Sequence, residues 1–266
     1  MKKRVLGAII ILAVVVPLLI IGKLPFKLFV MAIAGVGMYE LMKVREKTKK
    51  IPLVMQIIAC LFVILVVYFS NDYYSASYTI DYRIFVIAIL IYLLPVVLIN
   101  DNDKYNINDA LYLLGGSLFL SIGFNVFVIV RNIDLVYIIY LALITVMTDM
   151  FAYFTGRLIG RHKLCEKISP NKTIEGSIGG SIVGTVIPVL FYMFVINANA
   201  NLAVVILITF LFTIVGQIGD LLFSSIKRTF GVKDFSNLIP GHGGILDRFD
   251  SLLLVVITYM LFLTIL

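Results

Sequence analysis

Long runs of apolar residues decide what this chain can fold into, because about 20 apolar residues in a helix cross the hydrocarbon core of a bilayer. The sequence contains about nine such runs, separated by short segments that hold most of the charged residues. Only 14% of its 266 residues are charged, whereas about a quarter are charged in a soluble domain. The sequence therefore predicts an all-α fold, a polytopic transmembrane helical bundle with a polar cavity that faces the cytoplasm.

The predicted spans form a single integral-membrane domain, residues 1–266, because no Pro-, Gly- or Ser-rich linker interrupts the apolar runs. We expect residues 1–130 to be scaffold spans and residues 131–266 to be catalytic spans, since the chemistry-bearing residues gather in the second half. The spans are predicted at residues 5–21, 26–43, 53–70, 84–100, 109–130, 133–155, 174–196, 201–224 and 246–266.

Lysine and arginine residues indicate the orientation of these spans, because short cytoplasmic loops are enriched in them. They gather at the N-terminus and in the loops after the second, sixth and eighth spans, which all lie on one side of the membrane. We therefore predict a multi-pass protein of the cell membrane whose active site faces the cytoplasm. The net charge of +7 is assigned to these loops, so no nucleic-acid partner is expected.

Acidic residues near the end of the eighth span and the start of the ninth have helical spacing. Asp247 and Asp250 are three residues apart, which places them on one face of a helix. On the eighth span, the residues that share a face are Asp220, Ser224, Lys227 and Arg228. An ionised carboxylate inside a span usually faces a polar cavity or a partner. We expect Asp220 and Asp247 to face each other across the predicted cavity.

Carboxylates on two facing helices suit Mg²⁺, which takes one or two carboxylates and completes its shell with water and substrate phosphates. Lys227, Arg228 and Lys233 can hold phosphate oxygens, and the amides of the Gly-rich turn at residues 240–244 can bind an anion. Taken singly, the cations are typical of positive-inside loops and the turn is typical of any chain reversal. Their combination with the acids favours phosphoryl or nucleotidyl transfer.

The same stretch resembles the signature of the phosphatidate cytidylyltransferases, also called CDP-diacylglycerol synthases. The matching residues keep the family's spacing without a gap and are Ser224, Lys227, Arg228, Lys233, Asp234, Pro240, His242, Gly243, Gly244, Asp247, Arg248 and Asp250. Residues 169–180, with Lys172, Glu175 and Gly176, resemble a second block shared by the family, and Asp149 fits the segment before it.

The resemblance implies that CTP and phosphatidate react to give CDP-diacylglycerol and pyrophosphate, with Mg²⁺ and with the lipid phosphate as nucleophile. It implies that Asp220 and Asp247 hold the metal and that Asp220, Asp247, Lys227 and Asp250 are catalytic. The residues expected to bind substrate are Lys172, Ser224, Arg228, Lys233, Asp234, His242, Gly243, Gly244 and Arg248. CTP, phosphatidate and the bilayer are the expected partners, while a second, monovalent cation and a homodimer are left open.

Two other functions stay open from the sequence. A CTP-dependent lipid-alcohol kinase would share the chemistry and the membrane setting, but it would transfer the γ-phosphoryl group and release CDP. A cation-coupled transporter would use Asp149 and Asp220 along a path across the membrane. The transporter is the weaker alternative, because the acids gather at one membrane face beside lysine and arginine.

Three further features have structural interpretations. Glu40, an acid inside the second predicted span, is expected to reach the interface or to pair with a nearby cation. Thr173 is expected to begin a helix after a chain break at residues 169–171. The small residues that follow predict close helix packing, with phosphate binding at this helix start as the alternative, and are Gly176, Gly179, Gly180 and Gly184.

Overall fold

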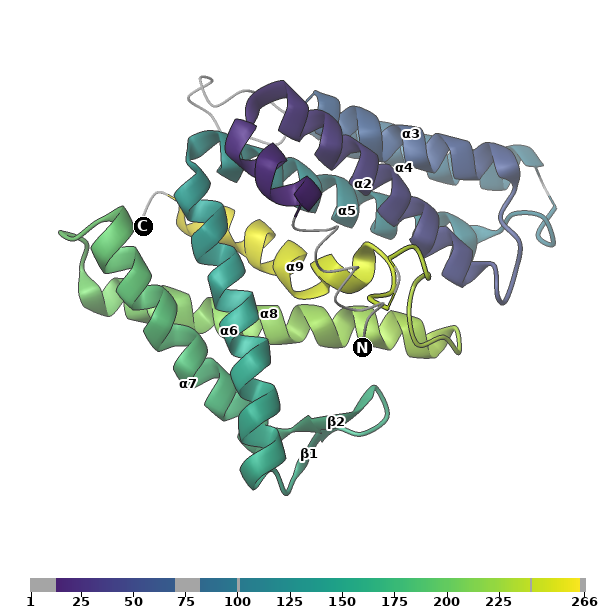
Figure 1. Cartoon of the computed structure of the whole chain (residues 1–266). Coiled ribbons are helices and arrows are strands. Elements are labelled where there is room, and N and C mark those ends of the chain that lie inside the picture. The colour runs from purple at the N-terminus through teal and green to yellow at the C-terminus, as the bar shows by residue number, and fades with distance from the viewer. Residues whose placement is uncertain (1–12, 70–81, 100, 240, 264–266) are drawn as a thin grey trace. The chain divides into compact units, whose positions relative to one another are not determined.

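The computed structural model describes residues 13–69, 82–99, 101–239 and 241–263 of the chain (Figure 1). The regular structure of these residues is helical apart from one short hairpin, which confirms the predicted all-α class. Residues 13–21 are helical. The elements that follow are α2 (Lys23–Arg45), α3 (Leu53–Tyr68), α4 (Tyr82–Ile99), α5 (Ile107–Ile133), α6 (Leu135–Ile159), β1 (Lys163–Cys165), β2 (Ser169–Thr173), α7 (Ile174–Phe191), the π-helical turn η1 (Tyr192–Ile196), α8 (Leu202–Thr229) and α9 (Leu246–Phe262).

Helix length and hydropathy make the chain a multi-pass membrane protein. Among the described residues, six helical segments are long and apolar enough to cross a bilayer, and they are α2, α4, α5, α6, α7 with η1, and α8. Two helices are shorter, since α3 has 16 residues and α9 has 17. Helices lie at eight of the predicted spans, while the first, residues 5–21, lies partly outside the described residues. The total number of spans stays a prediction.

The chain divides into two compact units. The first contains residues 1–132 and 230–248, and the second contains residues 133–229 and 249–266. The stretch that resembles the family signature, residues 224–250, is therefore shared between the units, because residues 230–248 group with the N-terminal helices. The predicted single domain, with its boundary between scaffold and catalytic spans near residue 130, stays a prediction.

In the first unit, α2 packs against α3, and the loop after α2 is fastened to the start of α5. The carboxylate of Asp109 pairs with Arg45 and Lys49 at 2.7 Å each. Asp109 is only 1% exposed, so the two cations offset the cost of burying its charge. These contacts hold the turn that follows α2 against the first turn of α5.

In the second unit, α6 and α7 pack closely through glycines, which confirms the predicted role of these small residues. A Cβ atom at Gly180 would lie 2.6 Å from the carbonyl oxygen of Thr148, and one at Gly176 would lie 2.7 Å from that of Ala152. Both contacts are to backbone atoms, which have little room to shift. Thr173 begins α7 as predicted, because its side chain accepts a hydrogen bond from the Gly176 amide at 3.1 Å.

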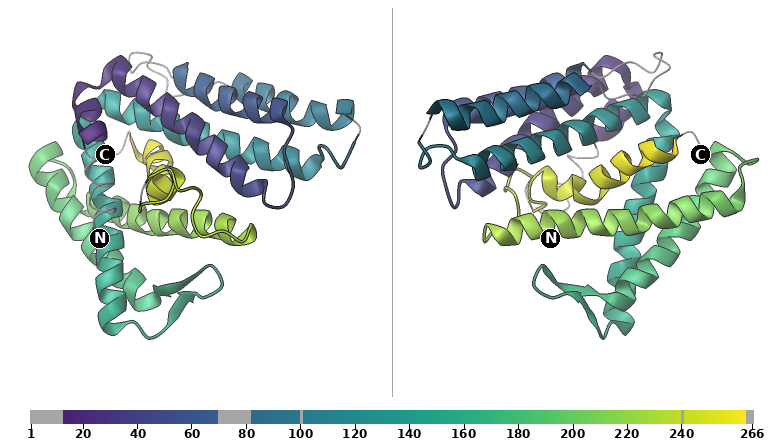
Figure 2. Two further views of the ribbon diagram at one scale, coloured as in Figure 1. Left: turned by 45° about the vertical axis from the view of Figure 1, so that its right-hand side comes forward. Right: turned by 180° about the vertical axis from the view of Figure 1, so that it is seen from behind.

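A hairpin of two antiparallel strands, β1 and β2, extends from the ends of α6 and α7 (Figure 2). Glu175 holds its base, since its carboxylate accepts from the Arg161 amide at 3.0 Å and lies 2.6 Å from Nδ1 of His162. The sequence predicted only a chain break here. The strands have three and five residues, too few to show an alternating pattern, and β2 contains a proline.

Candidate active site

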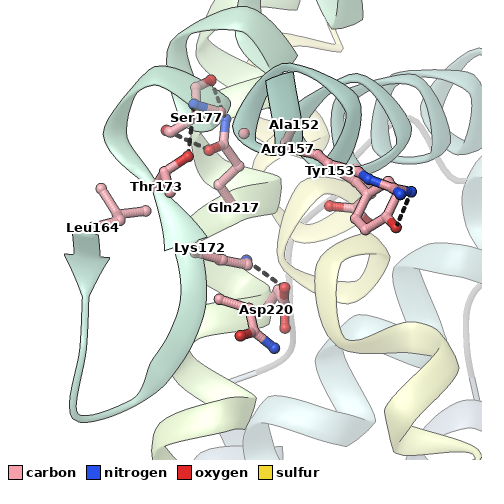
Figure 3. A pocket seen from close by; sticks show the side chains of 13 residues that line it. Ala152, Tyr153, Arg157, Leu164, Lys172, Thr173, Ser177, Gln217 and Asp220 are labelled. Atoms are coloured by element: carbon pink, nitrogen blue, oxygen red, sulfur yellow. Dashed lines mark hydrogen bonds and ion pairs between the residues drawn. The ribbon is translucent and has the colours of Figure 1, made fainter. Parts of the chain in front are cut away.

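A cavity of about 390 Å³ lies within the second unit, among α6, the hairpin, α7 and α8 (Figure 3). Its volume falls in the range typical of small-molecule sites. Most of its lining comes from α6, from the glycine-rich start of α7 and from polar side chains on α8 and β2. The residues that line it are Asp149, Ala152, Tyr153, Gly156, Arg157, Leu164, Asn171, Lys172, Thr173, Gly176, Ser177, Gln217 and Asp220.

An ion pair between Lys172 and Asp220 joins the hairpin to α8 inside this cavity. Figure 3 shows the lysine side chain extending from β2 toward the carboxylate. Ser224, one helical turn after Asp220, donates its hydroxyl to Oδ1 of the same carboxylate at 3.3 Å. Asp220 and Ser224 therefore lie on one face of α8, as predicted. Asp220 on this face contacts a lysine that lies 48 positions earlier in the sequence.

Two more aspartates of the second unit surround this pair. Asp149 is exposed to the cavity that it lines, and its charge interacts with those of Asp220 and Lys172. Asp250 interacts with Asp220 and Asp149, and it is attracted by Lys227, which is 7% exposed. The carboxylates of three aspartates and the ammonium groups of two lysines in this unit are thus close enough to interact electrostatically.

This set of donors fits a divalent cation that keeps part of its own shell. Carboxylate oxygens are the hard ligands that Mg²⁺ and similar ions prefer, and the three acids outnumber the two lysines. Within the described residues, no three acidic, histidine or cysteine side chains form a group that could hold a metal ion by themselves. An ion held here would therefore take its remaining ligands from water or from substrate phosphates.

Gln217 is a polar residue of this site that the sequence analysis did not assign. Its side chain accepts from the Ser177 hydroxyl and donates to the Ser181 hydroxyl at 2.8 Å, so it ties α8 to α7 one turn before Asp220. Gln217 is 7% exposed. The signal that could have revealed it is a glutamine inside an apolar run, three residues before an acid in the same run.

Arg228 fastens the hairpin. Its Nε donates to the carbonyl oxygen of Ile168 at 3.2 Å, near the turn between β1 and β2. The sequence predicted that α8 ends near residue 224, with Lys227 and Arg228 in the loop that follows. The helix continues instead to Thr229, so both residues are helical and their side chains keep the face shared with Asp220. Whether Arg228 also binds phosphate stays a prediction.

The other half of the signature lies in the first unit. Oδ2 of Asp247 accepts from the amides of Phe235 at 2.8 Å and Gly244 at 2.9 Å, which closes the loop before α9. Gly243 has a φ of 81°, and a Cβ atom there would lie 2.7 Å from Oδ2 of Asp247. Glycine is therefore needed beside this aspartate for a local structural reason.

Glu40 binds the same loop from α2. The residue is 2% exposed, and its carboxylate accepts from the amides of Ile245 at 3.0 Å and Leu246 at 2.9 Å and from the Ser236 hydroxyl at 2.6 Å. The expectation that Glu40 reaches the interface or pairs with a cation is wrong. Burial leaves it no water, and the donors within reach are two backbone amides and a serine hydroxyl of the loop.

Several amides of the Gly-rich turn and of the two residues that follow it are thus committed within the protein. Those of Gly244, Ile245 and Leu246 bind carboxylates, and the amide of His242 donates to the carbonyl oxygen of Ile239 at 2.9 Å. The predicted contact of His242, Gly243 and Gly244 with substrate stays a prediction.

The remaining signature residues also lie in the first unit. Lys233 and Asp234 line a second cavity, of about 680 Å³, with Lys43 of α2 and Lys47 of the turn that follows it. Arg248 is an exposed residue of the first turn of α9. Because Asp220 and Asp247 belong to different units, their predicted convergence stays a prediction.

Helices that cross a membrane and carboxylates gathered beside lysines define an integral-membrane enzyme of phosphate chemistry. More closely, the chain belongs to the cytidylyltransferase family, whose model matches residues 2–266. It is 39% identical to the phosphatidate cytidylyltransferase of Staphylococcus haemolyticus over 257 residues, 96% of each chain. It is 34% identical to the phosphatidate cytidylyltransferase of Bacillus subtilis over 260 residues, 96% of this chain and 95% of that protein.

Proposed function

We propose that the chain is the enzyme that transfers the cytidylyl group of CTP to phosphatidate and releases pyrophosphate. The observation that carries this proposal is the cavity in which Lys172 pairs with Asp220 beside Asp149, within helices long enough to cross a membrane. The family membership and the activity named for both relatives support the same reaction. Neither alternative, the lipid-alcohol kinase or the transporter, is favoured.

The reaction needs no protein nucleophile, because the phosphate of phosphatidate is itself one. One of its oxygens attacks the α-phosphorus of CTP in line. The new P–O bond forms as the bond to the oxygen bridging the α- and β-phosphates breaks, and pyrophosphate leaves with that electron pair. The protein therefore positions two polyanions and balances the charge that develops between them.

Residues of the second unit supply the positive charge that balances the phosphates. Lys172 and Lys227 are the cations that would hold the phosphate oxygens, because both already lie among the carboxylates. Ser224 fixes the Asp220 carboxylate by its hydroxyl group. We also propose that Arg228 and Lys233 contact phosphate and that Asp234, His242, Gly243, Gly244 and Arg248 contact substrate.

Asp220 and Asp247 would hold a divalent cation, with Asp250 in support, and we propose Mg²⁺ as the ion. A bound divalent cation supplies charge neutralisation for the phosphate oxygens. Lys172 would then have a second role besides binding phosphate: it would orient the Asp220 carboxylate, for which it competes with the cation. The proposal leaves open whether a second, monovalent cation binds and whether the protein forms a homodimer.

The proposed active site faces the cytoplasm, where CTP is available, and opens to the bilayer, where phosphatidate resides. This orientation follows from the lysine- and arginine-rich loops, which include the hairpin that borders the cavity.

An assay on the purified protein with CTP and phosphatidate tests the proposal directly. Pyrophosphate and CDP-diacylglycerol should form in equal amounts, and removal of divalent cations should stop both. Diacylglycerol offered in place of phosphatidate should give neither product. Release of CDP with phosphorylation of the lipid alcohol would instead identify the kinase. Cation uptake into liposomes that depends on Asp220 but needs no CTP would identify the transporter.

A further inference from the structure

The carboxylate of Glu40 is a buried charge bound by neutral donors. The side chain lies in α2, and its three donors come from the segment that joins α8 to α9 and from the first residue of α9, about 200 positions later in the sequence. A carboxylate is costly to bury unless hydrogen bonds replace the water it loses. The three bonds, of 2.6 to 3.0 Å, supply that replacement.

Two of the donors are amides at the N-terminal end of α9. The first amides of a helix have no partner inside the helix, and a negative charge placed there is stabilised by the helix dipole. Such amides are usually capped by a side chain close in sequence. In α9 the amides of Ile245 and Leu246 are capped instead by a glutamate from another helix of the same unit.

Glu40 and Asp247 divide the amides of one loop between them. Asp247 takes the amides of Phe235 and Gly244, and Glu40 takes those of the next two residues, Ile245 and Leu246. Asp247 directly follows Leu246 in the chain, so a shift of Leu246 moves Asp247 as well.

Gly244 shows how closely the glutamate and the loop are fitted. A Cβ atom at this position would lie 2.5 Å from Oε1 and 2.6 Å from Oε2 of Glu40. The absence of a side chain at Gly244 is therefore what allows the Glu40 carboxylate to reach the amides that follow.

We propose that Glu40 is a positioning residue for cytidylyl transfer, which sets the place of Asp247 by holding the start of α9. The expected effect on turnover rests on the proposed function, whereas the anchoring of the start of α9 by Glu40 does not. Glu40 has no step in the chemistry. Its effect on turnover passes through the loop from residue 235 to residue 247.

The decisive variant is Glu40→Gln, which keeps the size of the side chain but replaces one acceptor oxygen with a donor. That donor meets an amide N–H, so one hydrogen bond is lost and the loop moves. We expect kcat to fall about 10- to 100-fold while the KM for CTP changes by less than about threefold. Glu40→Asp keeps the charge on a shorter side chain and should recover part of the loss.

Hydrogen–deuterium exchange gives a readout that does not depend on activity. Peptides covering residues 235–247 should exchange faster in Glu40→Gln than in the unmodified protein, because an amide at the start of α9 loses its acceptor and the loop is held less firmly. Asp109→Asn is the matched control, since Asp109 is equally buried in the same unit but binds Arg45 and Lys49. It should lower the unfolding temperature and leave the exchange of this loop and kcat unchanged.

Ser236→Ala keeps the inference testable if the Glu40 variants do not fold. This variant removes one hydrogen bond to Glu40 without burying a new charge, and it should raise exchange in the same peptides and lower kcat by a smaller factor. Unchanged exchange and unchanged kcat in Glu40→Gln, or in Ser236→Ala where the former is unfolded, would overturn the inference. A wild-type protein that makes no CDP-diacylglycerol would refute the proposed function, and the exchange result would still decide whether Glu40 anchors the loop.

Discussion

Lys172 and Asp220 form an ion pair between the second strand of the hairpin and α8, at the wall of the cavity in the second unit. Both side chains are partly buried, with exposed fractions of 26% and 23%. A pair in such a place is stronger than one on an open surface, because water screens it less. The two residues are also a cation and an acid that the reaction would use.

The variant Lys172→Ala should reduce kcat/KM by about 100- to 1,000-fold, because it removes a cation from the point where phosphate charge develops. Lys172→Arg should retain part of the activity, since it keeps the charge but changes the geometry. Lys167→Ala is the control, because Lys167 is an exposed lysine of the same hairpin. Steady-state kinetics with pyrophosphate release as readout checks this, and equal losses at both lysines would contradict it.

Asp220→Asn and Asp247→Asn should each reduce turnover by more than about 100-fold, because each removes a negative charge that the proposed divalent cation requires. Size-exclusion profiles should stay normal, since asparagine keeps the shape of the side chain and an acceptor oxygen. Asp101→Asn, in the loop before α5, serves as the control. Near-normal turnover in either site variant would remove that residue from the metal assignment.

Gly180→Ala should lower the free energy of unfolding by about 1–3 kcal/mol, because its Cβ atom would press on the backbone oxygen of Thr148 at 2.6 Å. Gly115→Ala provides the matched case, since no atom lies within 4 Å of a Cβ atom at that helical position. It should be neutral or stabilising by up to about 1 kcal/mol. Thermal unfolding in detergent compares the two, and an equal effect of both would show that packing of α6 on α7 is not the cause.

Single cysteines introduced by Lys47→Cys, Lys163→Cys and Lys233→Cys should react with an impermeant reagent only from the cytoplasmic side, because the loops that contain them are rich in lysine and arginine. The native Cys60 and Cys165 are first replaced by serine. Asn199→Cys, between η1 and α8, should react from the outside. Labelling of any of the three lysine positions from outside would contradict the predicted orientation.

The helices were predictable because each is a long apolar run, and eight of the predicted spans contain one. The face of α8 that carries Asp220 and Ser224 was also predictable, since it follows from helical spacing alone. The ends of the helices were less predictable. α8 runs five residues past its predicted end, because polar residues at a membrane surface can continue a helix once their side chains find partners.

The role of Glu40 was not predictable from the sequence. An acid in an apolar helix indicates that a partner exists, but nothing local says which one, and here the partners are amides of a distant loop. The pairing of Lys172 with Asp220 is similar, because it depends on a hairpin too short to give a strand signal. In both cases the missing information is tertiary.

The hairpin restricts insertions and deletions of residues in β2. Successive residues of a strand point to opposite faces, so one residue inserted into or deleted from β2 would turn Lys172 away from Asp220. Arg228 and Glu175 clamp the two ends of the hairpin and leave little slack to absorb such a shift. Among related chains, substitutions along β2 are therefore more tolerable than changes in its residue count.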